Sequence, residues 1–414
     1  MITVYTFIFL VLIFGGSLLK SKITSIFLLS YLIKVVFPFY YFSQNSEIDF
    51  FADLLAASSL VIITLASISF GGYSKKVDLN IYLSKSYVHV AMLMIPIAWL
   101  AFLLPALIEQ TLPPLYLALN GDYIGAHLSR VYITKSSTFG VMIDIVGKVF
   151  FPILLLVLST SYRTQSKSER AVTYLLLLVT LFVSFSYFQK AFPFILILIF
   201  VLGLSLCGYM SKSSWAKFGI ICAVLLLMVS TLYSSDISIG ILKFQDLLFR
   251  RLGKTPVIVY LAYIEYGSLY GSQILEYNFI LNKTSQTPAL PMVIYQFMSY
   301  GTSSTGWANG LYVGDLFVNF GVTGVVVISF FIGYLIRLGN KFIYEARYNL
   351  WFLLGLMAIL MFCLNLPGNS FFGFSTFFYI LLFLVSNFIN RYIRIRKSKI
   401  VFKITRPLTS IEAQ

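Results

Sequence analysis

The chain has 414 residues, of which 59% are hydrophobic and 11% are charged, and its mean hydropathy is +0.89. Soluble domains carry about 25% charged residues because water must wet their surfaces, so this composition excludes a soluble globular protein. We expect an all-α polytopic membrane protein, surrounded by lipid along most of its length. Three cysteines in apolar runs and two histidines offer neither a disulfide framework nor a metal-ligand spacing, so we expect no cofactor.

Eleven apolar runs approach the length of about 20 residues that a helix needs to cross a bilayer. They occupy residues 1–19, 24–43, 50–71, 87–108, 139–160, 171–188, 191–208, 215–233, 316–336, 349–367 and 372–389. No low-complexity linker divides them, so we expect a single membrane domain, 1–414, that ends in a basic tail at 390–414. Lys20 and Lys22 follow the first run where a signal peptide would have a small-residue cleavage site.

The net charge of +15 is spread unevenly over the connections between these runs. Connections on one side carry 20 Lys and Arg residues and those on the other carry 8, although the second set includes the longest connections. The positive-inside rule then places the C-terminal tail in the cytoplasm and the N-terminus outside. We therefore interpret the basicity as an orientation signal in a cytoplasmic membrane and expect no nucleic-acid partner.

Two long connections lie on the expected outer side, at 109–138 and 234–315. The second begins with the amphipathic, tyrosine-rich segment Ser238–Ser272, whose leucines recur at helical spacing. Such a segment lies at the outer membrane interface or folds back onto the helix bundle.

Arg250, Arg251 and Lys254 in this segment place three cations on the side that the positive-inside rule keeps poor in them. A phosphate or diphosphate ligand would offset these charges, because guanidinium groups match phosphate oxygens and stay charged. The alternative is that the cations pair with Asp246 and Glu265, or with anionic lipid headgroups.

A glycine-rich stretch, Gly301–Gly324, leads from this connection into the ninth run. Asp315 and Asn319 are four residues apart, so they share one helix face. A carboxylate and an amide beside an aromatic side chain suit a sugar site, and the candidate sugar contacts are Trp307, Asn309, Tyr312 and Asn319. The alternative is that Asp315 caps the helix and Trp307 belongs to an interfacial belt.

The first long connection adds two candidates, His127 as a general base and Arg130 as a further diphosphate contact. Its alternative interpretation is a solvated amphipathic loop helix. Within the second run, Lys34 has no local partner, which is a default indication of function in a membrane span. Snorkelling or a contact to a phosphate would also account for Lys34.

Two segments resemble the bacterial oligosaccharide repeat-unit polymerases, also called O-antigen or capsule polymerases. They are FRRLGKTPVIVYLAYIEY (249–266) and TGWANGLYVGDLFVNFGVTG (305–324). The second resembles the family's helix start through Gly314, Asp315, Phe317, Asn319, Phe320, Gly321 and Gly324. The resemblance covers about 90 residues, and Ser303-Ser304 replace the Asn-x-Asn that often precedes Thr-Gly in the family.

This resemblance implies a GT-C-like, O-antigen ligase-like architecture and a glycosyltransferase in the bacterial inner membrane. The enzyme would transfer a growing glycan from undecaprenyl diphosphate onto the non-reducing end of a lipid-linked repeat unit, at the periplasmic face. Its partners would be undecaprenyl-diphosphate-linked oligosaccharides, membrane lipid and a polysaccharide chain-length regulator. Asp315, Glu265 and His127 are the candidate general bases, and the sequence leaves the choice among them open.

Other functions remain as alternatives. An O-antigen ligase shares the architecture and the lipid-diphosphate donor but transfers the glycan to the lipid A core. A flippase for lipid-linked oligosaccharide would have shorter outer connections, and a membrane O-acyltransferase would place a histidine in a recognisable motif. A non-enzymatic scaffold leaves the Arg250-Arg251 pair and the glycine-rich stretch unexplained.

Overall fold

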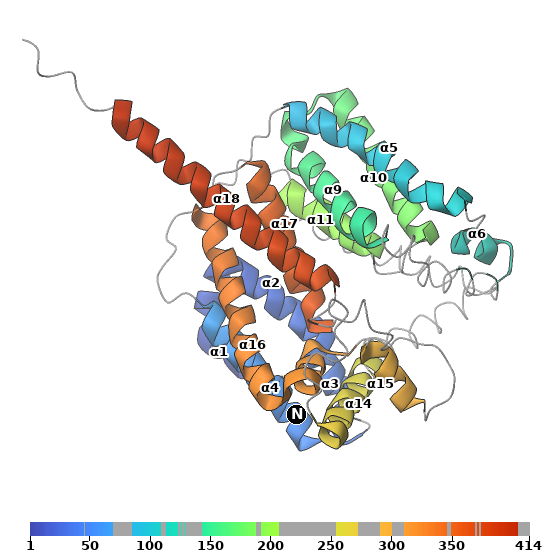
Figure 1. The fold of residues 1–414 in the computed structure, drawn as a ribbon, viewed down its shortest axis with the longest axis vertical. Coiled ribbons are helices and arrows are strands. Elements are labelled where there is room, and N and C mark those ends of the chain that lie inside the picture. Colours follow the sequence, from blue (N-terminus) through green and yellow to red (C-terminus); the bar gives the residue numbers. More distant parts are fainter. Residues whose placement is uncertain are drawn as a thin grey trace, which may run out of the picture. The chain divides into compact units, whose positions relative to one another are not determined.

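A computed structural model describes residues 1–44, 46–68, 85–108, 113–122, 125, 129, 143–187, 192–206, 254–271, 290–299, 310–345, 349–368, 371 and 374–404. Every regular element in these ranges is a helix, which confirms the all-α prediction. The chain divides into two compact units, one made of 1–75 and 252–414 and the other of 76–251. Figure 1 labels the helices along the chain.

Within the described residues, four helices are long and apolar enough to cross a membrane: Ile23–Ser43, Phe50–Ser67, Tyr312–Tyr344 and Leu350–Gly368. They coincide with four of the eleven predicted runs, and the membrane character of the chain rests on them. Four further runs correspond to the shorter apolar helices Ile2–Leu18, Lys85–Leu100, Phe151–Thr160 and Ile195–Leu204. Run 171–188 overlaps the helix Lys167–Tyr187, and run 372–389 overlaps the helix Phe374–Ile404. Run 215–233 lies outside the described residues.

The first unit contains the helices from both ends of the chain. From the N-terminal part come α1 (Ile2–Lys20), α2 (Lys22–Tyr31), the π-helical turn η1 (Leu32–Val36), α3 (Phe37–Ser43) and α4 (Phe50–Ser67). From the C-terminal part come α14 (Thr255–Tyr270), α15 (Leu290–Met298), α16 (Tyr312–Glu345), α17 (Leu350–Asn365), the 3-10 turn η6 (Leu366–Gly368) and α18 (Phe374–Ile404). Helix α16 packs along α4, and α17 packs against α18 and α2.

The second unit contains α5 (Lys85–Ile108), α6 (Pro114–Leu119), the π-helix η2 (Ile143–Phe150), α9 (Phe151–Thr160), η3 (Tyr162–Thr164), α10 (Lys167–Tyr187) and α11 (Phe192–Leu206). Helix α9 packs against α5 and α11. His89 Nε2 lies 3.0 Å from Glu169 Oε1, which ties the start of α5 to the start of α10. Trp99 Nε1 donates to Thr180 Oγ1 at 3.2 Å further along the same two helices.

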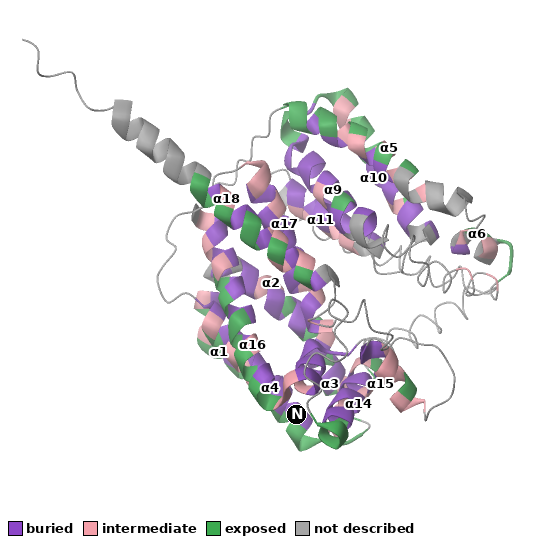
Figure 2. Cartoon of the chain, in the orientation of Figure 1, coloured by how far each residue is buried: buried purple, intermediate pink, exposed green. Residues whose placement is uncertain are grey.

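Buried and exposed positions alternate around most helices of each unit (Figure 2). Helix α17 is buried on nearly all sides, with eleven buried residues between Phe352 and Cys363. Helix α4 instead exposes Phe50, Leu54 and Leu65 and buries Ala56, Leu60 and Ile63. Large exposed apolar side chains on a helix that also has a buried stripe are the pattern of a helix with one face toward lipid.

Helix α16 breaks at Gly321, which has φ 65° and ψ −162°. A residue that carries a side chain rarely adopts this backbone conformation, whereas glycine adopts it freely. Contacts on both sides of the break show that the chain reverses direction. Tyr312 and Ser329 are 17 positions apart, yet both hydroxyls contact Ser59 Oγ, at 2.7 and 2.6 Å.

A straight helix would hold two residues 17 positions apart about 25 Å from each other. Phe317 instead packs edge-on against Phe51 near the start of α4, whereas Tyr312 contacts Ser59 two turns further along that helix. Residues 312–320 therefore run antiparallel to α4, and residues 322–345 return parallel to it. We call residues 312–320 the re-entrant segment.

Candidate functional site

The re-entrant segment carries a buried polar pair, Asp315 and Asn319, which are 3% and 2% exposed. Asn319 Nδ2 donates to the backbone oxygen of Asp315 at 2.8 Å and lies 3.3 Å from Asp315 Oδ1. The prediction that these residues share one helix face is therefore confirmed. Asn319 Oδ1 is buried and has no hydrogen-bond partner among the described residues, so it is an acceptor that a ligand hydroxyl would satisfy.

The second carboxylate oxygen of Asp315 is held by another part of the chain. The backbone N–H of Phe371 donates to Asp315 Oδ2 at 3.0 Å. Phe371 follows η6 in the connection between α17 and α18. Two donors from different elements thus fix the orientation of one buried carboxylate, and fixed orientation is what a general base or a hydroxyl-binding group requires.

Helix α14 forms a wall of the site through its tyrosines. A Cβ atom at Gly314 would lie 2.8 Å from Tyr263 Cβ, and one at Gly310 would lie 2.6 Å from Tyr263 Cε2. These glycines therefore let the ring of Tyr263 lie directly against the backbone that leads into the re-entrant segment. Burial first, and then the charge of Asp315, raise the pKa of the Tyr263 phenol well above its usual value, so the phenol stays protonated.

The same helix is anchored to the bundle at two further points. Tyr260 donates its hydroxyl hydrogen to the backbone oxygen of Ala52 at 2.8 Å. A buried cluster joins α14 to α15 and to the re-entrant segment, with Val259, Ala262, Tyr263, Tyr266, Leu290, Ile294 and Val318 as its members. Residues 255–270 of the predicted amphipathic segment therefore fold back onto the bundle, which was one of its two expected placements.

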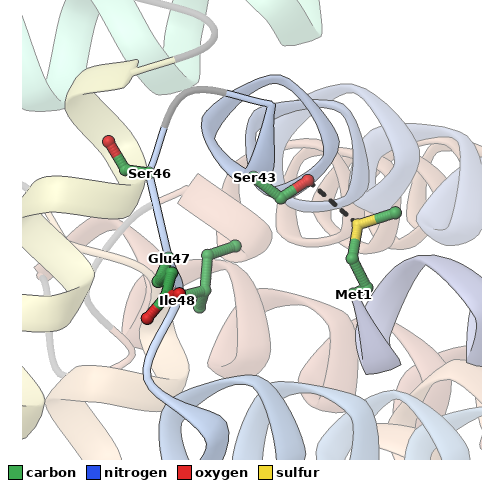
Figure 3. A pocket seen from close by; sticks show the side chains of 5 residues that line it. All are labelled: Met1, Ser43, Ser46, Glu47 and Ile48. Carbon is green, nitrogen blue, oxygen red and sulfur yellow. Dashed lines mark hydrogen bonds between the residues drawn. The ribbon is translucent and has the colours of Figure 1, made fainter.

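A second polar feature lies at the same end of the first unit. An open pocket of about 530 Å³ is lined by Met1, Ser43, Ser46, Glu47 and Ile48 (Figure 3). At the start of α4, Asp53 is 2% exposed and accepts hydrogen bonds from the backbone N–H groups of Ile2 and Thr3, at 2.6 and 2.8 Å. The Met1 amino group forms an ion pair with the same carboxylate.

The predicted site residues fall into four groups. Asp315 and Asn319 are brought together, as described above. Tyr312 lies on the same segment, but it is fully buried and its hydroxyl contacts Ser59, so in this structure it packs against α4 and offers no surface to a sugar. Lys254, the N-cap of α14, and Glu265 within α14 are both exposed. His127, Arg130, Arg250, Arg251, Trp307 and Asn309 lie outside the described residues.

Sequence reasoning missed Tyr263, Phe371 and the reversal at Gly321. Phe371 contacts Asp315 across 56 positions of the chain. Such a contact cannot be predicted from residue spacing in a single sequence. Gly321 does interrupt an apolar helical pattern, which is a known sign of a kink or a close approach. In the described part of the chain, no three His, Cys, Asp or Glu side chains gather into a metal site.

Comparison of the chain with models of protein families, with curated proteins and with solved structures returns no match.

Proposed function

We propose that the protein is a polysaccharide polymerase of the bacterial inner membrane that uses lipid-diphosphate-linked oligosaccharides as donor and acceptor. The observation that carries the proposal is the buried Asp315–Asn319 pair on a re-entrant helix. Backbone that reverses within the depth of a helix bundle is tolerated where it is buried in protein or lines a polar cavity. Buried ionisable groups at such positions mark substrate sites by default.

In this proposal Asp315 accepts the proton of the acceptor hydroxyl. The hydroxyl oxygen attacks the anomeric carbon of the donor glycan, and the bond from that carbon to the lipid diphosphate breaks. The leaving diphosphate takes the bonding electron pair, and cations stabilise the charge that develops on it. In the same proposal Asn319 Oδ1, which is buried without a hydrogen-bond partner within the ranges that the structure describes, accepts a hydrogen bond from a second hydroxyl of the acceptor sugar.

The distribution of charge over the first unit supports an outer location for this site. The end of the unit that holds the re-entrant segment also carries Glu47, Asp49 and Asp53. The opposite end, where α1 ends and α2 begins, carries Lys20 and Lys22, and α16 places Arg337 and Lys341 near its own end. By the positive-inside rule the acidic end faces the periplasm.

The finer parts of the proposal extend beyond the described residues. They are eleven spans in a GT-C-like arrangement, an inner-membrane location and a cytoplasmic C-terminus. Arg250, Arg251, Lys254 and Arg130 remain the proposed diphosphate contacts, and Glu265 and His127 remain alternative bases. Trp307 and Asn309 remain the proposed sugar contacts.

The test is a gel of the surface polysaccharide from a strain that lacks this gene. A single repeat unit on the lipid A core, with no ladder, is the expected result, because export and ligation continue without polymerisation. Polymer that accumulates on undecaprenyl diphosphate with no repeats on the core would show a ligase instead. Loss of all repeats would favour a flippase, and an unchanged ladder would overturn the proposal.

A further inference from the structure

Lys34 is a charged residue within the apolar candidate span Ile23–Ser43. An ammonium group inside a membrane span is costly, and such residues usually belong to a substrate or ion site. Lys34 lies in η1, the π-helical turn that joins α2 to α3. A π-helical turn inside a helix is less stable than the α form and is frequently found at functional sites, so two independent features single out this position.

The Lys34 side chain is held in place by the end of α17. Its Nζ atom donates to the backbone oxygen of Leu364 at 2.5 Å, and Ser30 Oγ donates to the same oxygen at 3.0 Å. A Cβ atom at Gly368 would lie 3.0 Å from Lys34 Cδ, so the missing side chain of Gly368 leaves room for the lysine. The C-terminal end of a helix also favours a nearby cation.

These contacts leave donor capacity on the ammonium group. Lysine has three N–H donors and no acceptor, and the Leu364 oxygen takes one of them. Among the residues that the structure describes, no ion pair includes Lys34. A half-buried cation that is fixed by a carbonyl and has donors to spare is suited to binding an anion.

An exposed apolar stripe runs along the helix beside Lys34. Its members are three or four residues apart, so they share one helix face. They are Leu29, Ile33, Phe37 and Tyr40, whose exposed fractions are 57%, 48%, 37% and 49%. A fixed cation next to an apolar stripe matches an amphiphile that has an anionic head and a hydrocarbon tail. A soluble anion would gain nothing from the stripe.

We infer that Lys34 binds the diphosphate of an isoprenoid-linked substrate whose hydrocarbon chain lies on this apolar stripe. The inference rests on the proposed function and adds to it a cation that lies within the bundle. The segment from Leu364 to Phe371 contacts Lys34 at one end and Asp315 at the other. One connection thus joins the proposed anion site to the proposed acceptor site.

The test uses the purified full-length protein in nanodiscs and titrates it with farnesyl diphosphate. Lys34→Gln is expected to weaken binding about tenfold or more, the usual effect of losing one charge-assisted hydrogen bond. Lys34→Arg should keep most of the affinity because it keeps the charge. Lys85→Gln, which removes an exposed lysine at the start of α5, is the matched control and should bind like the wild type.

Further arms of the titration separate the sources of the phosphate. Inorganic pyrophosphate should compete with farnesyl diphosphate, and farnesol should not compete. Nanodiscs rich in phosphatidylglycerol should weaken the apparent affinity little compared with phosphatidylcholine nanodiscs. Strong competition by phosphatidylglycerol would overturn the inference in favour of a phospholipid site. Unchanged affinity in Lys34→Gln would overturn it in favour of a lysine that only caps α17.

A labelling experiment in the wild type guards against variants that fail to fold. Bound farnesyl diphosphate should protect the Lys34 amine from acetylation, as measured by mass spectrometry, and should leave Lys85 unprotected. Equal labelling of Lys34 with and without the ligand would overturn the inference. An unchanged polysaccharide ladder in the deletion strain would overturn the proposed function without affecting these binding results, so the two failures are distinguishable.

Discussion

The backbone N–H of Phe371 lies 3.0 Å from Asp315 Oδ2, although 56 positions separate the two residues. The contact joins the connection after α17 to the re-entrant segment of α16. Asp315 therefore makes a structural contact, to which the proposed function adds a chemical role. Its carboxylate orients the neighbouring backbone, and in the proposed reaction it accepts a proton.

Asp315→Asn should abolish polymer formation while the protein still accumulates in the membrane. The amide keeps the size of the side chain and one oxygen acceptor, but it has no basic oxygen for the acceptor proton. The expected loss of rate is about 10²–10⁴-fold, the usual contribution of a general base. The measurement is glycan chain length from lipid-linked repeat units supplied to the reconstituted protein.

The control for this variant is Asp49→Asn. Asp49 is exposed, and its carboxylate accepts from the N–H of Ala52 at the start of α4. The same loss of charge at the same end of the unit should leave polymer length unchanged, because an asparagine caps a helix about as well as an aspartate. Wild-type chains from Asp315→Asn would remove Asp315 from the proposed mechanism.

Gly321→Ala should destabilise the protein and shorten or abolish the polymer. Nothing lies within 4 Å of a Cβ atom at this position, so the cost comes from the backbone conformation alone. Forcing a residue other than glycine into this region costs about 1–3 kcal/mol. Thermal unfolding in detergent measures the loss, and the polymer assay measures its effect on the site.

Gly16→Ala in α1 is the matched control for the backbone effect. This position also has nothing within 4 Å of a Cβ atom, and its φ is not positive. Alanine inside a helix is favoured over glycine by about 0.5–1 kcal/mol, so this variant should be as stable as the wild type or more stable. Equal stability of both alanine variants would show that the chain does not reverse at Gly321.

The sequence predicted the class of fold and part of the site for identifiable reasons. Hydrophobic runs near span length identify membrane helices because lipid leaves few alternatives, and four of the predicted runs are long apolar helices here. The spacing of Asp315 and Asn319 is sufficient to predict that they share one helix face, because residues four positions apart in a helix always lie on the same side.

The reversal at Gly321 could not be predicted in the same way. Gly321 within the run 316–336 is compatible with a kink as well as with a straight span. The reversal itself is shown only by the contacts with Ser59 and Phe51, which form in the folded unit. The sequence predicts Tyr312 as a sugar contact, together with Trp307, Asn309 and Asn319. In the structure the Tyr312 side chain is fully buried and its hydroxyl contacts Ser59, a placement that residue spacing in one sequence does not show.

Asn340 provides a test of packing at the opposite end of the first unit. It is fully buried, its Oδ1 accepts from the N–H of Ile23 at 2.9 Å, and its Nδ2 donates to Thr24 Oγ1 at 2.8 Å. Asn340→Leu leaves the Ile23 N–H and the Thr24 hydroxyl without these partners. The expected destabilisation is about 1–3 kcal/mol, measured by thermal unfolding in detergent.

Thr24→Val should cost less than Asn340→Leu, because it removes only the hydrogen bond with Thr24 and keeps those of Asn340 with Ile23 and Ser67. The double variant should cost little more than Asn340→Leu alone, since residues in one network are not additive. Full additivity would show that Thr24 and Asn340 act independently and that the bond between them contributes little.

We predict that Glu169 makes the stability of the second unit depend on pH. Its Oε2 accepts from the N–H of Ser166 at 2.6 Å, while Ser166 Oγ accepts from the N–H of Glu169 at 3.3 Å, which together form a capping box for α10. The backbone hydrogen bond from Ser166, followed by the hydrogen bond with His89, lowers the pKa of Glu169 from 4.5 to about 2. The ionised side chain is therefore the stabilising form.

A carboxyl group whose pKa is lower in the folded state stabilises the protein above its unfolded pKa, and this stabilisation is lost as the pH falls toward the folded value. Glu169→Gln should accordingly lower the unfolding temperature at pH 6, and the difference from the wild type should shrink between pH 4.5 and pH 2. Glu47→Gln, at an exposed carboxylate between α3 and α4, is the control and should show no such convergence. If the difference in unfolding temperature between Glu169→Gln and the wild type stays constant with pH, the charge of Glu169 does not stabilise the start of α10.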